Sequence, residues 1–377
     1  MLTVRPVVTK ADRKTFVDLP WQVYRADPAW VPPLKDEVHG LIDPGRNPWF
    51  EHARAQLWVA EREGRPVGRI SAQVDQLVQL HMGEATGQWG MFECLDAEAA
   101  AALFAVAEEW LAGQGMIRSL GPFSLSVWDE VGLEIEGFEH APTVMMPHHR
   151  PEYSDWVADA GYSKVRDLLT YEVEIASWND TKIDRLIAMG ERNSRIRIRT
   201  VDKSRFDEEA RLILGLLNDA WSDNWGFIPL TEAEIAYAGK KLKPVIYEEL
   251  VRIAELDGEP VAFMMTLPDV NELIRDLDGK LFPFGWAKLL WRLRKPRTSR
   301  VQVPLMGVAR KLHQTRLASQ IAFMLIEKTR RAAVEKFGVT TGEFGWILED
   351  NKGMLSIAEL PGARVNHVYR LYEKALG

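Results

Sequence analysis

The chain has 377 residues, of which 46% are hydrophobic and 27% are charged, and its net charge is −7. This length is typical of two domains, each able to bury its own core. The negative charge excludes a global basic field, so DNA is not an expected partner. The lone cysteine, Cys94, excludes an intrachain disulfide, and Met1–Lys10 lacks the apolar segment of a signal peptide. No apolar run reaches the ~18 residues of a transmembrane helix, and we therefore expect a cytoplasmic protein.

The first half of the chain is predicted to mix strands and helices. Alternating and helical apolar periodicities, with glycine stops, define the elements. In chain order they are a strand at Thr3–Val8, helices at Asp12–Arg25 and Pro33–Ile42, a hairpin around 60–67, a strand at Gly87–Leu95, a long helix at Ala97–Gly113, a strand at Ile117–Leu120, a short helix at Glu152–Ala160 and a strand at Lys164–Ile175.

The second half is predicted to repeat this order. Its elements are a strand at Arg197–Val201, helices at Asp207–Ser222 and Glu232–Lys241, a hairpin around 254–261, a strand at Arg300–Val308, a long helix at Thr315–Phe337, a strand at Thr341–Leu348, a short helix at Lys352–Leu360 and a strand at Arg364–Glu373. Each half carries one insertion, at Pro122–Glu139 in the first and at 269–297 in the second.

Matching segments support a true duplication. Residues 60–67 read Ala-Glu-Arg-Glu-Gly-Arg-Pro-Val and residues 254–261 read Ala-Glu-Leu-Asp-Gly-Glu-Pro-Val, a spacing of 194. In both, an acidic-glycine turn joins two apolar strands. At the same spacing Val4-Arg5 matches Ile198-Arg199, and the ends of the halves match as well. Because the matches occur in one order, we predict two tandem domains, 1–176 and 177–377.

The order of elements in each half resembles the GNAT (acyl-CoA N-acyltransferase) family over nearly the whole chain. Met306-Gly307-Val308, followed by a loop and a long helix, is similar to the family's acetyl-CoA signature, and Asn351…Gly362-Ala363…Tyr369 is similar to its last helix and strand. The resemblance implies an α/β fold with a mixed sheet in each of two tandem GNAT-like domains. It also implies acetyl-CoA or another acyl-CoA as co-substrate and an amine, of a small molecule or a peptide, as acceptor.

The resemblance places the cofactor at the head of the second long helix, where backbone N–H groups would hold the CoA pyrophosphate. The loop residues are His313, Gln314, Thr315, Arg316, Leu317 and Ala318, next to Met306, Gly307 and Val308. Arg316 stands where the family has glycine. Arg310, Lys311, His313 and Arg316 make this helix head basic, whereas the first half has Glu93, Asp96 and Glu98 at the equivalent helix. Cations attract a phosphate and acids repel it, so we expect CoA in the C-terminal half only. The alternative is a solvated basic turn.

Candidate catalytic residues are less defined. The family's usual tyrosine is replaced by Ala358, and by Val157 in the first half. Glu343, flanked by glycines and aromatics, is a candidate base with a raised pKa, or else a residue in a surface salt bridge. Tyr369 is a candidate acid, or else a packing residue. Asn351 either contacts the cofactor or caps the last helix. No partner at metal-ligand spacing accompanies His148-His149, so no metal site is expected.

The two insertions carry further features. In 286–300, Trp286, Leu289, Leu290 and Leu293 share one helical face beside Lys288, Arg292, Arg294 and Lys295. Such a helix suits a membrane or an RNA backbone, but a lid packed on its own domain is the favoured interpretation. In the other insertion, Trp128, Asp129 and Glu130 form a cluster suited to an amine.

The leading hypothesis is an acyl-CoA-dependent N-acyltransferase, with acetyl as the favoured acyl group. Alternatives are a Fem-type transferase using aminoacyl-tRNA, an N-myristoyltransferase-like enzyme using long-chain acyl-CoA, and a degenerate pair that binds a ligand or partner without turnover. The sequence leaves the acceptor and the oligomeric state open.

Overall fold

The computed structural model describes residues 1–177, 181–359 and 362–377. The chain divides into two units: unit 1 contains Met1–Leu168, Ile274–Leu281 and His367–Gly377, and unit 2 contains Leu169–Leu273 and Phe282–Asn366. The predicted division after residue 176 follows the repeat in the sequence. The compact units instead exchange segments, since the chain's last strand from His367 onward pairs with strands of unit 1. Among the described residues, no helix has the length and apolarity needed to cross a membrane.

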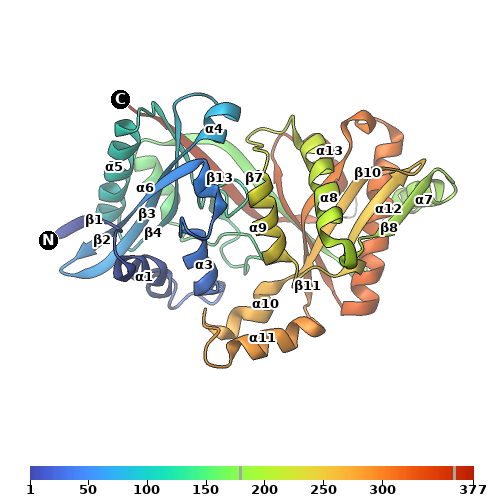
Figure 1. The fold of residues 1–377 in the computed structure, drawn as a ribbon, viewed down its shortest axis with the longest axis horizontal. Coiled ribbons are helices and arrows are strands. Elements are labelled where there is room, and N and C mark those ends of the chain that lie inside the picture. Colours follow the sequence, from blue (N-terminus) through green and yellow to red (C-terminus); the bar gives the residue numbers. More distant parts are fainter. Residues whose placement is uncertain (178–180, 360–361) are drawn as a thin grey trace. The chain divides into compact units, whose positions relative to one another are not determined.

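Unit 1 is a mixed sheet with the strand order β1-β2-β3-β4-β5-β13, and β6 pairs with β13. Figure 1 labels β1, β2, β3, β4 and β13 of this sheet. Its elements are β1 Leu2–Pro6, α1 Lys10–Asp18, α2 Pro20–Val23, α3 Lys35–Leu41, β2 Ala53–Arg62, β3 Arg65–Asp75, α4 Gln76–His81, β4 Thr86–Cys94, α5 Ala97–Gly113, β5 Arg118–Gly121, β6 Leu133–Glu136, α6 Tyr153–Asp159, the first part of β7 Ser163–Glu174 and most of β13 Arg364–Ala375. The helix predicted at Asp12–Arg25 is broken, because Pro20 begins a separate short helix.

Unit 2 has the strand order β8-β9-β10-β11-β12-β7. Its elements are α7 Thr181–Glu191, β8 Ile196–Thr200, α8 Phe206–Trp221, α9 Glu232–Leu242, β9 Val251–Leu256, β10 Glu259–Pro268, α10 Val270–Ile274, α11 Gly285–Arg294, β11 Arg300–Val308, α12 Arg316–Ala332, β12 Thr341–Leu348 and α13 Lys352–Glu359. A π-helical turn at Ala333–Phe337 completes the long helix. Leu360, the predicted end of the last helix, lies outside the described residues.

Each unit buries its long helix against its own sheet. In unit 1, α5 packs on β3, with Leu103, Phe104 and Leu111 fully buried. In unit 2, α12 packs on β9 and β10, with Ile321 and Leu325 fully buried (Figure 1). The apolar stripe recurring at i, i+3, i+4 and i+7 explains which face each helix buries. Each long helix follows the strand that precedes it, β4 or β11, after a connecting loop.

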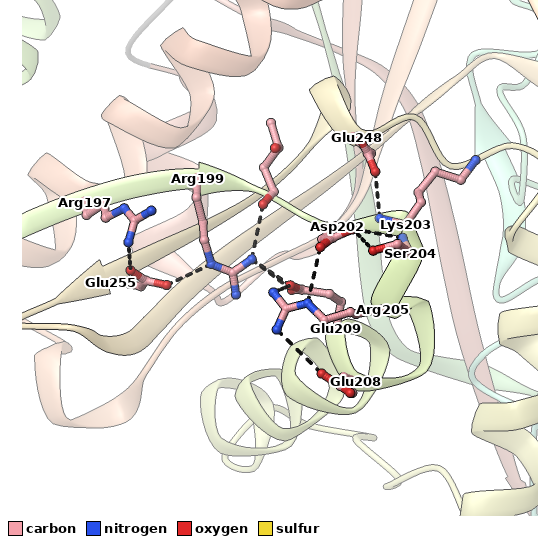
Figure 2. Close-up of polar contacts among 11 residues, drawn as sticks. Arg197, Arg199, Asp202, Lys203, Ser204, Arg205, Glu208, Glu209, Glu248 and Glu255 are labelled. Carbon is pink, nitrogen blue, oxygen red and sulfur yellow. Dashed lines mark hydrogen bonds and ion pairs between the residues drawn. The ribbon is translucent and has the colours of Figure 1, made fainter.

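An ion-pair triad occurs in the same place in both units. Arg5 on β1 pairs with Glu61 on β2 and with Asp12 in the first turn of α1. Arg199 on β8 pairs with Glu255 on β9 and with Glu209 in the first turn of α8, each at 2.8 Å (Figure 2).

The strand registers agree with this correspondence. Val4 lies opposite Ala60, and Ile198 lies opposite Ala254. The spacing of 194 residues between the matching hairpins thus relates paired strands and not only turns.

Candidate cofactor site and a buried polar cluster

In unit 2, the parallel strands β11 and β12 separate after four residue pairs. Arg300–Val303 pairs with Thr341–Phe344, while β11 continues to Val308 and β12 to Leu348. The register of β11 against β10 also shifts beyond Leu305, where two residues of β11, Val303 and Pro304, oppose a single residue of β10. This β-bulge bends the strand. The far half of β11 is therefore left without a paired strand on the β12 side.

The free edge of β11 carries main-chain polar groups. The amide of Ala309 donates to Val261 on the β10 side. Because alternate residues point to opposite edges, Met306 and Val308 point their N–H and C=O groups away from β10. Both carbonyls have partners: Trp221 Nε1 donates to Met306 at 2.9 Å, and His313 Nε2 lies 2.8 Å from the Val308 oxygen. The edge thus presents its amides for hydrogen bonding to an extended ligand.

The head of α12 follows this edge directly. Thr315 is the N-cap, and its hydroxyl accepts from the amide of Ala318. Gln314 adopts a positive φ of 61°, which turns the chain into the helix. Arg316, at the position where glycine was expected, is exposed, and no acidic partner for it occurs among the described residues. One uncompensated cation therefore stands at a helix end that attracts anions.

The other two cations of this loop have acidic partners. Arg310 Nε lies 3.3 Å from Asp223, and the Arg310 amide donates to Asp219. Lys311 lies 2.7 Å from Glu259. These pairs are about half exposed, so solvent screens them and a strong anion competes for the cations. The positive charge at the head of α12 is smaller than the sequence predicts.

The head of α5 in unit 1 is occupied by its own charges. Asp96 is the N-cap, accepting from the Ala99 amide, and Arg62 pairs with both Asp96 and Glu98. The hydrogen bond from Arg62 is the main cause that lowers the pKa of Asp96. Glu93, predicted to belong to this acidic group, does not: its side chain joins a different cluster. Asp96 nevertheless already satisfies the helix head.

That cluster is a buried carboxylate between two tyrosines. Tyr24 and Tyr153 donate their hydroxyls to Glu93 at 2.6 and 3.0 Å, and Arg69 lies 3.6 Å away. Burial raises the pKa of Glu93 to about 7, against the opposing effects of Arg69 and the two hydroxyls. Glu93 can therefore bind or release a proton near neutral pH.

A cavity of about 30 Å³ adjoins Glu93. Such a volume holds one or two water-sized groups. Its polar lining consists of Arg69, Glu93, Ser124, Glu130, His148 and His149. Of the insertion cluster proposed to grip an amine, only Glu130 belongs to this lining.

A second buried carboxylate, Glu134, lies among three histidines. His367 and His148 lie 2.9 and 3.0 Å from its oxygens, and the amide of His149 donates to it at 2.9 Å. Asp27 contacts the far nitrogen of His148 at 2.9 Å. Burial by itself would raise the pKa of Glu134, but the hydrogen bonds from His148 and His367 lower it to about 2.

The histidines around Glu134 differ in charge. Burial lowers the pKa of His148, but Glu134 and Asp27 outweigh that effect and the net shift is upward. Burial lowers the pKa of His149 to about 4, consistent with a neutral ring that accepts from the Glu134 amide. The charged form of His148 thus lies between two carboxylates. No group of described residues has the arrangement of a metal site.

Two curated bacterial proteins match the chain over nearly its whole length. A bacterial ceramide synthase of Caulobacter vibrioides (strain NA1000 / CB15N) is 42% identical over 377 residues, which is 100% of this chain and 98% of the relative. Protein YghO of Escherichia coli (strain K12) is 40% identical over 374 residues, 99% of this chain and 95% of the relative. The chain belongs to their family. No family model matches it.

Solved structures identify the fold of this family member. A tandem GNAT protein from the clavulanic acid biosynthesis pathway covers 100% of the chain and 99% of its own, with a TM-score of 0.58 and 14% identity. A GCN5-related N-acetyltransferase from Sphaerobacter thermophilus covers 100% and 96%, with a TM-score of 0.52 and 14% identity. The predicted tandem GNAT fold is confirmed.

The two candidate catalytic residues, Glu343 and Tyr369, belong to different units. Glu343 lies on β12 in unit 2, is 1% exposed and accepts from Asn366 at 2.7 Å, so it is not a surface residue. Tyr369 lies on β13 in unit 1, fully buried and stacked on His367. Asn351 caps α13 by accepting from the Met354 amide. The residues predicted to bind the cofactor, from Met306 to Ala318, lie along the end of β11, the following loop and the first residues of α12.

Sequence reasoning missed the polar cluster of unit 1. Glu134 was not singled out, and His148-His149 were considered only as metal ligands. The usable signal was the carboxylate of Glu134 in an insertion that also contains Val131 and Leu133, which are buried, shortly before His148-His149 in the chain. A polar residue between buried apolar neighbours needs a partner.

Proposed function

We propose that this protein is an acyl-CoA-dependent N-acyltransferase that joins a long acyl chain to the amino group of a sphingoid-type amino alcohol. The family member named bacterial ceramide synthase supports the substrate class, since a ceramide is the amide of a fatty acid and such an amine. In the reaction the neutral amine nitrogen attacks the thioester carbonyl, the C–N bond forms and the C–S bond breaks. The nitrogen gives up one proton and keeps one as the amide N–H, and the thiolate takes up one proton, so CoA leaves as the thiol.

The observation that carries the proposal is the head of α12. It combines a helix start, the exposed cation Arg316 and the unpaired edge of β11 in one turn. The pyrophosphate of an acyl-CoA would lie at the helix start, because main-chain donors and positive charge coincide there. The amides of Met306 and Val308 would pair with the extended pantetheine arm. The free amides also suit an oxyanion that develops on the thioester carbonyl.

The test measures acyl-CoA affinity and product together. The full chain is titrated with acetyl-CoA and palmitoyl-CoA by calorimetry, and N-acylation of a sphingoid base is followed by mass spectrometry. Arg316→Glu should weaken binding at least tenfold, because it places an acid where the phosphate would lie. Arg211→Glu, the same change at an exposed position on α8, is the matched control and should bind as the parent does. Absence of binding by either acyl-CoA would refute the proposal.

Ala358, which stands where the family has its usual tyrosine and has no proton to donate, favours a second candidate, a protein that binds an acyl-CoA without turnover. Binding that depends on Arg316, combined with no amide product from acetyl-CoA or palmitoyl-CoA, would decide for this candidate. An amide product formed from palmitoyl-CoA but not from acetyl-CoA would decide for the long-chain transferase.

A further inference from the structure

Large apolar side chains gather on the surface of unit 2 just before and within α11. Phe282 is 82% exposed, Phe284 78%, Trp286 48%, Leu290 54% and Trp291 73%. All the exposed phenylalanine and tryptophan side chains of the described residues lie in this stretch. Soluble surfaces rarely expose such a contiguous apolar group, and one that does marks an interaction site.

The fold of unit 2 holds α11 with these side chains pointing outward. Tyr247 donates its hydroxyl to the carbonyl of Leu293 at 2.5 Å, and Arg292 donates to the carbonyl of Leu273. Leu289 and Leu293 are half-buried on this inner side. The predicted single apolar face of Trp286, Leu289, Leu290 and Leu293 is therefore divided. Trp286 and Leu290, with Trp291, form an outer stripe, because residues one turn apart share a face.

The chain segment that carries this stripe is basic. Residues 281–299 contain five lysines and arginines and no acid, in a chain whose net charge is −7. Arg294, Lys295 and Arg297 are exposed. Aromatic side chains flanked by cations are the composition of helices that lie in the headgroup region of a bilayer. An anionic lipid surface complements both properties at once.

We propose that Phe282–Arg297 is a docking surface for anionic lipid bilayers, with the outer stripe of α11 inserted at headgroup depth. We name these residues the interfacial segment. At ten residues and about 1.5 Å of rise each, α11 lies along a membrane and is too short to span one. RNA offers phosphates to the cations but leaves the phenylalanine, leucine and tryptophan side chains in water, so the bilayer is the better match.

This inference rests on the proposed function in one respect: a long-chain amine and a long acyl chain are poorly soluble and partition into membranes. An enzyme docked at the bilayer would meet both at high local concentration. The docking itself follows from the exposed side chains and does not require turnover.

The test is sedimentation of the full chain with vesicles. The protein should sediment with vesicles made of equal parts phosphatidylcholine and phosphatidylglycerol. The fraction that sediments with pure phosphatidylcholine vesicles should be at least threefold smaller. The double variant Phe282→Ser/Trp291→Ser should lose about tenfold in partition, because it removes much of the inserted apolar area. Arg294→Gln/Lys295→Gln should lose several-fold in partition and become less sensitive to salt, because three of the five cations of the segment remain. Leu80→Ser and Ile117→Ser, two exposed apolar positions in unit 1, are the matched controls and should partition as the parent does.

The outcomes separate this inference from the proposed function. Equal partition of the double variant and the parent would overturn the docking surface. So would loss of a parent dimer in the double variant, or loss of tRNA binding without any vesicle binding, because either result assigns the stripe to another occupant. If vesicle binding follows the prediction while no acyl-CoA binds, the proposed function fails and the docking surface stands.

Discussion

The starts of α5 and α12 occupy corresponding places in the two units but differ in how their charged groups are paired. At α5, Asp96 caps the helix and Arg62 forms an ion pair with that acid, so the charges at this helix start are paired within the protein. At α12, a neutral threonine caps the helix and Arg316 has no acidic partner among the described residues. The two units share the register of their first two strands, whereas the charges at the two helix starts differ. The proposed function places the ligand at the head of α12, where the charges are incompletely paired.

The same contrast extends into the units. Unit 1 buries acids with their partners, Glu134 with histidines and Glu93 with tyrosines and Arg69. Such networks are costly to break because a buried charge loses its only compensation. Unit 2 places its loop cations at the surface, where pairing contributes little to stability. We therefore expect substitutions to alter stability in unit 1 and ligand affinity at the head of α12.

The largest expected effect is on unit 1. Glu134→Gln removes a fully buried charge next to His148 and His367 and should destabilise the protein by about 3 kcal/mol. Urea unfolding followed by circular dichroism would show a lower midpoint. Glu136→Gln, an exposed position on the same strand, should change stability by less than about 0.5 kcal/mol. Equal midpoints for the two variants would mean that the cluster does not stabilise unit 1.

The next effect is a pH dependence from Glu93. Its pKa is raised from 4.5 to about 7, so the folded state binds a proton more tightly than the unfolded state does. The stabilising contribution is complete below about pH 4.5 and is lost as pH rises through about 7, by about 2 kcal/mol at most after allowance for the adjoining cavity. Glu93→Gln should flatten this slope between pH 5 and 8, measured by urea midpoints. A slope unchanged in the variant would assign the pH dependence to other groups.

Features formed by residues close together in the sequence were predictable, whereas contacts between residues far apart in the sequence were not. The match of Val4-Arg5 with Ile198-Arg199 is visible in the sequence, whereas the triads join residues 56 positions apart, Arg5 with Glu61 and Arg199 with Glu255. The turn at His313–Ala318 follows from one strand-to-helix junction. By contrast, Glu134 and His367 are 233 positions apart in the sequence, and no periodicity relates them.

For the cations of the α12 loop, too, the cluster itself was predictable from the sequence, whereas its acidic partners were not. Their clustering is visible in the sequence, but the acids that bind Arg310 are Asp219, in the last turn of α8, and Asp223, just after that helix. Only the packing of α8 on β11 brings those acids to the loop. The sequence therefore overestimates the free positive charge there.

A smaller effect on folding stability is expected from the N-cap residues, Asp96 of α5 and Thr315 of α12, which allow the two helix starts to be compared directly. Asp96→Ala should cost about 1–2 kcal/mol, since it removes a cap and the partner of Arg62. Thr315→Ala should cost about 1 kcal/mol or less, because no ion pair is lost with it. Under the proposed function, acyl-CoA should stabilise the Asp96 variant as much as the parent and the Thr315 variant less, because the gain depends on the affinity that each variant keeps at the head of α12. Equal thermal shifts with ligand in both variants would remove the functional contrast between the helices.

The smallest effect tests whether internal acids limit the affinity of the α12 loop. Asp223→Asn frees the side chain of Arg310 from an exposed pair at 3.3 Å and should raise acyl-CoA affinity about twofold, in keeping with the small energies of surface pairs. The gain should shrink at high salt, because screening weakens the freed cation and the phosphate alike. Glu249→Gln frees Lys336 near the other end of the same helix and is the matched control, for which we expect unchanged affinity. A gain in both variants would indicate a change in overall charge, whereas a gain confined to Asp223→Asn would identify Arg310 as a second cation that the ligand recruits from its internal partner.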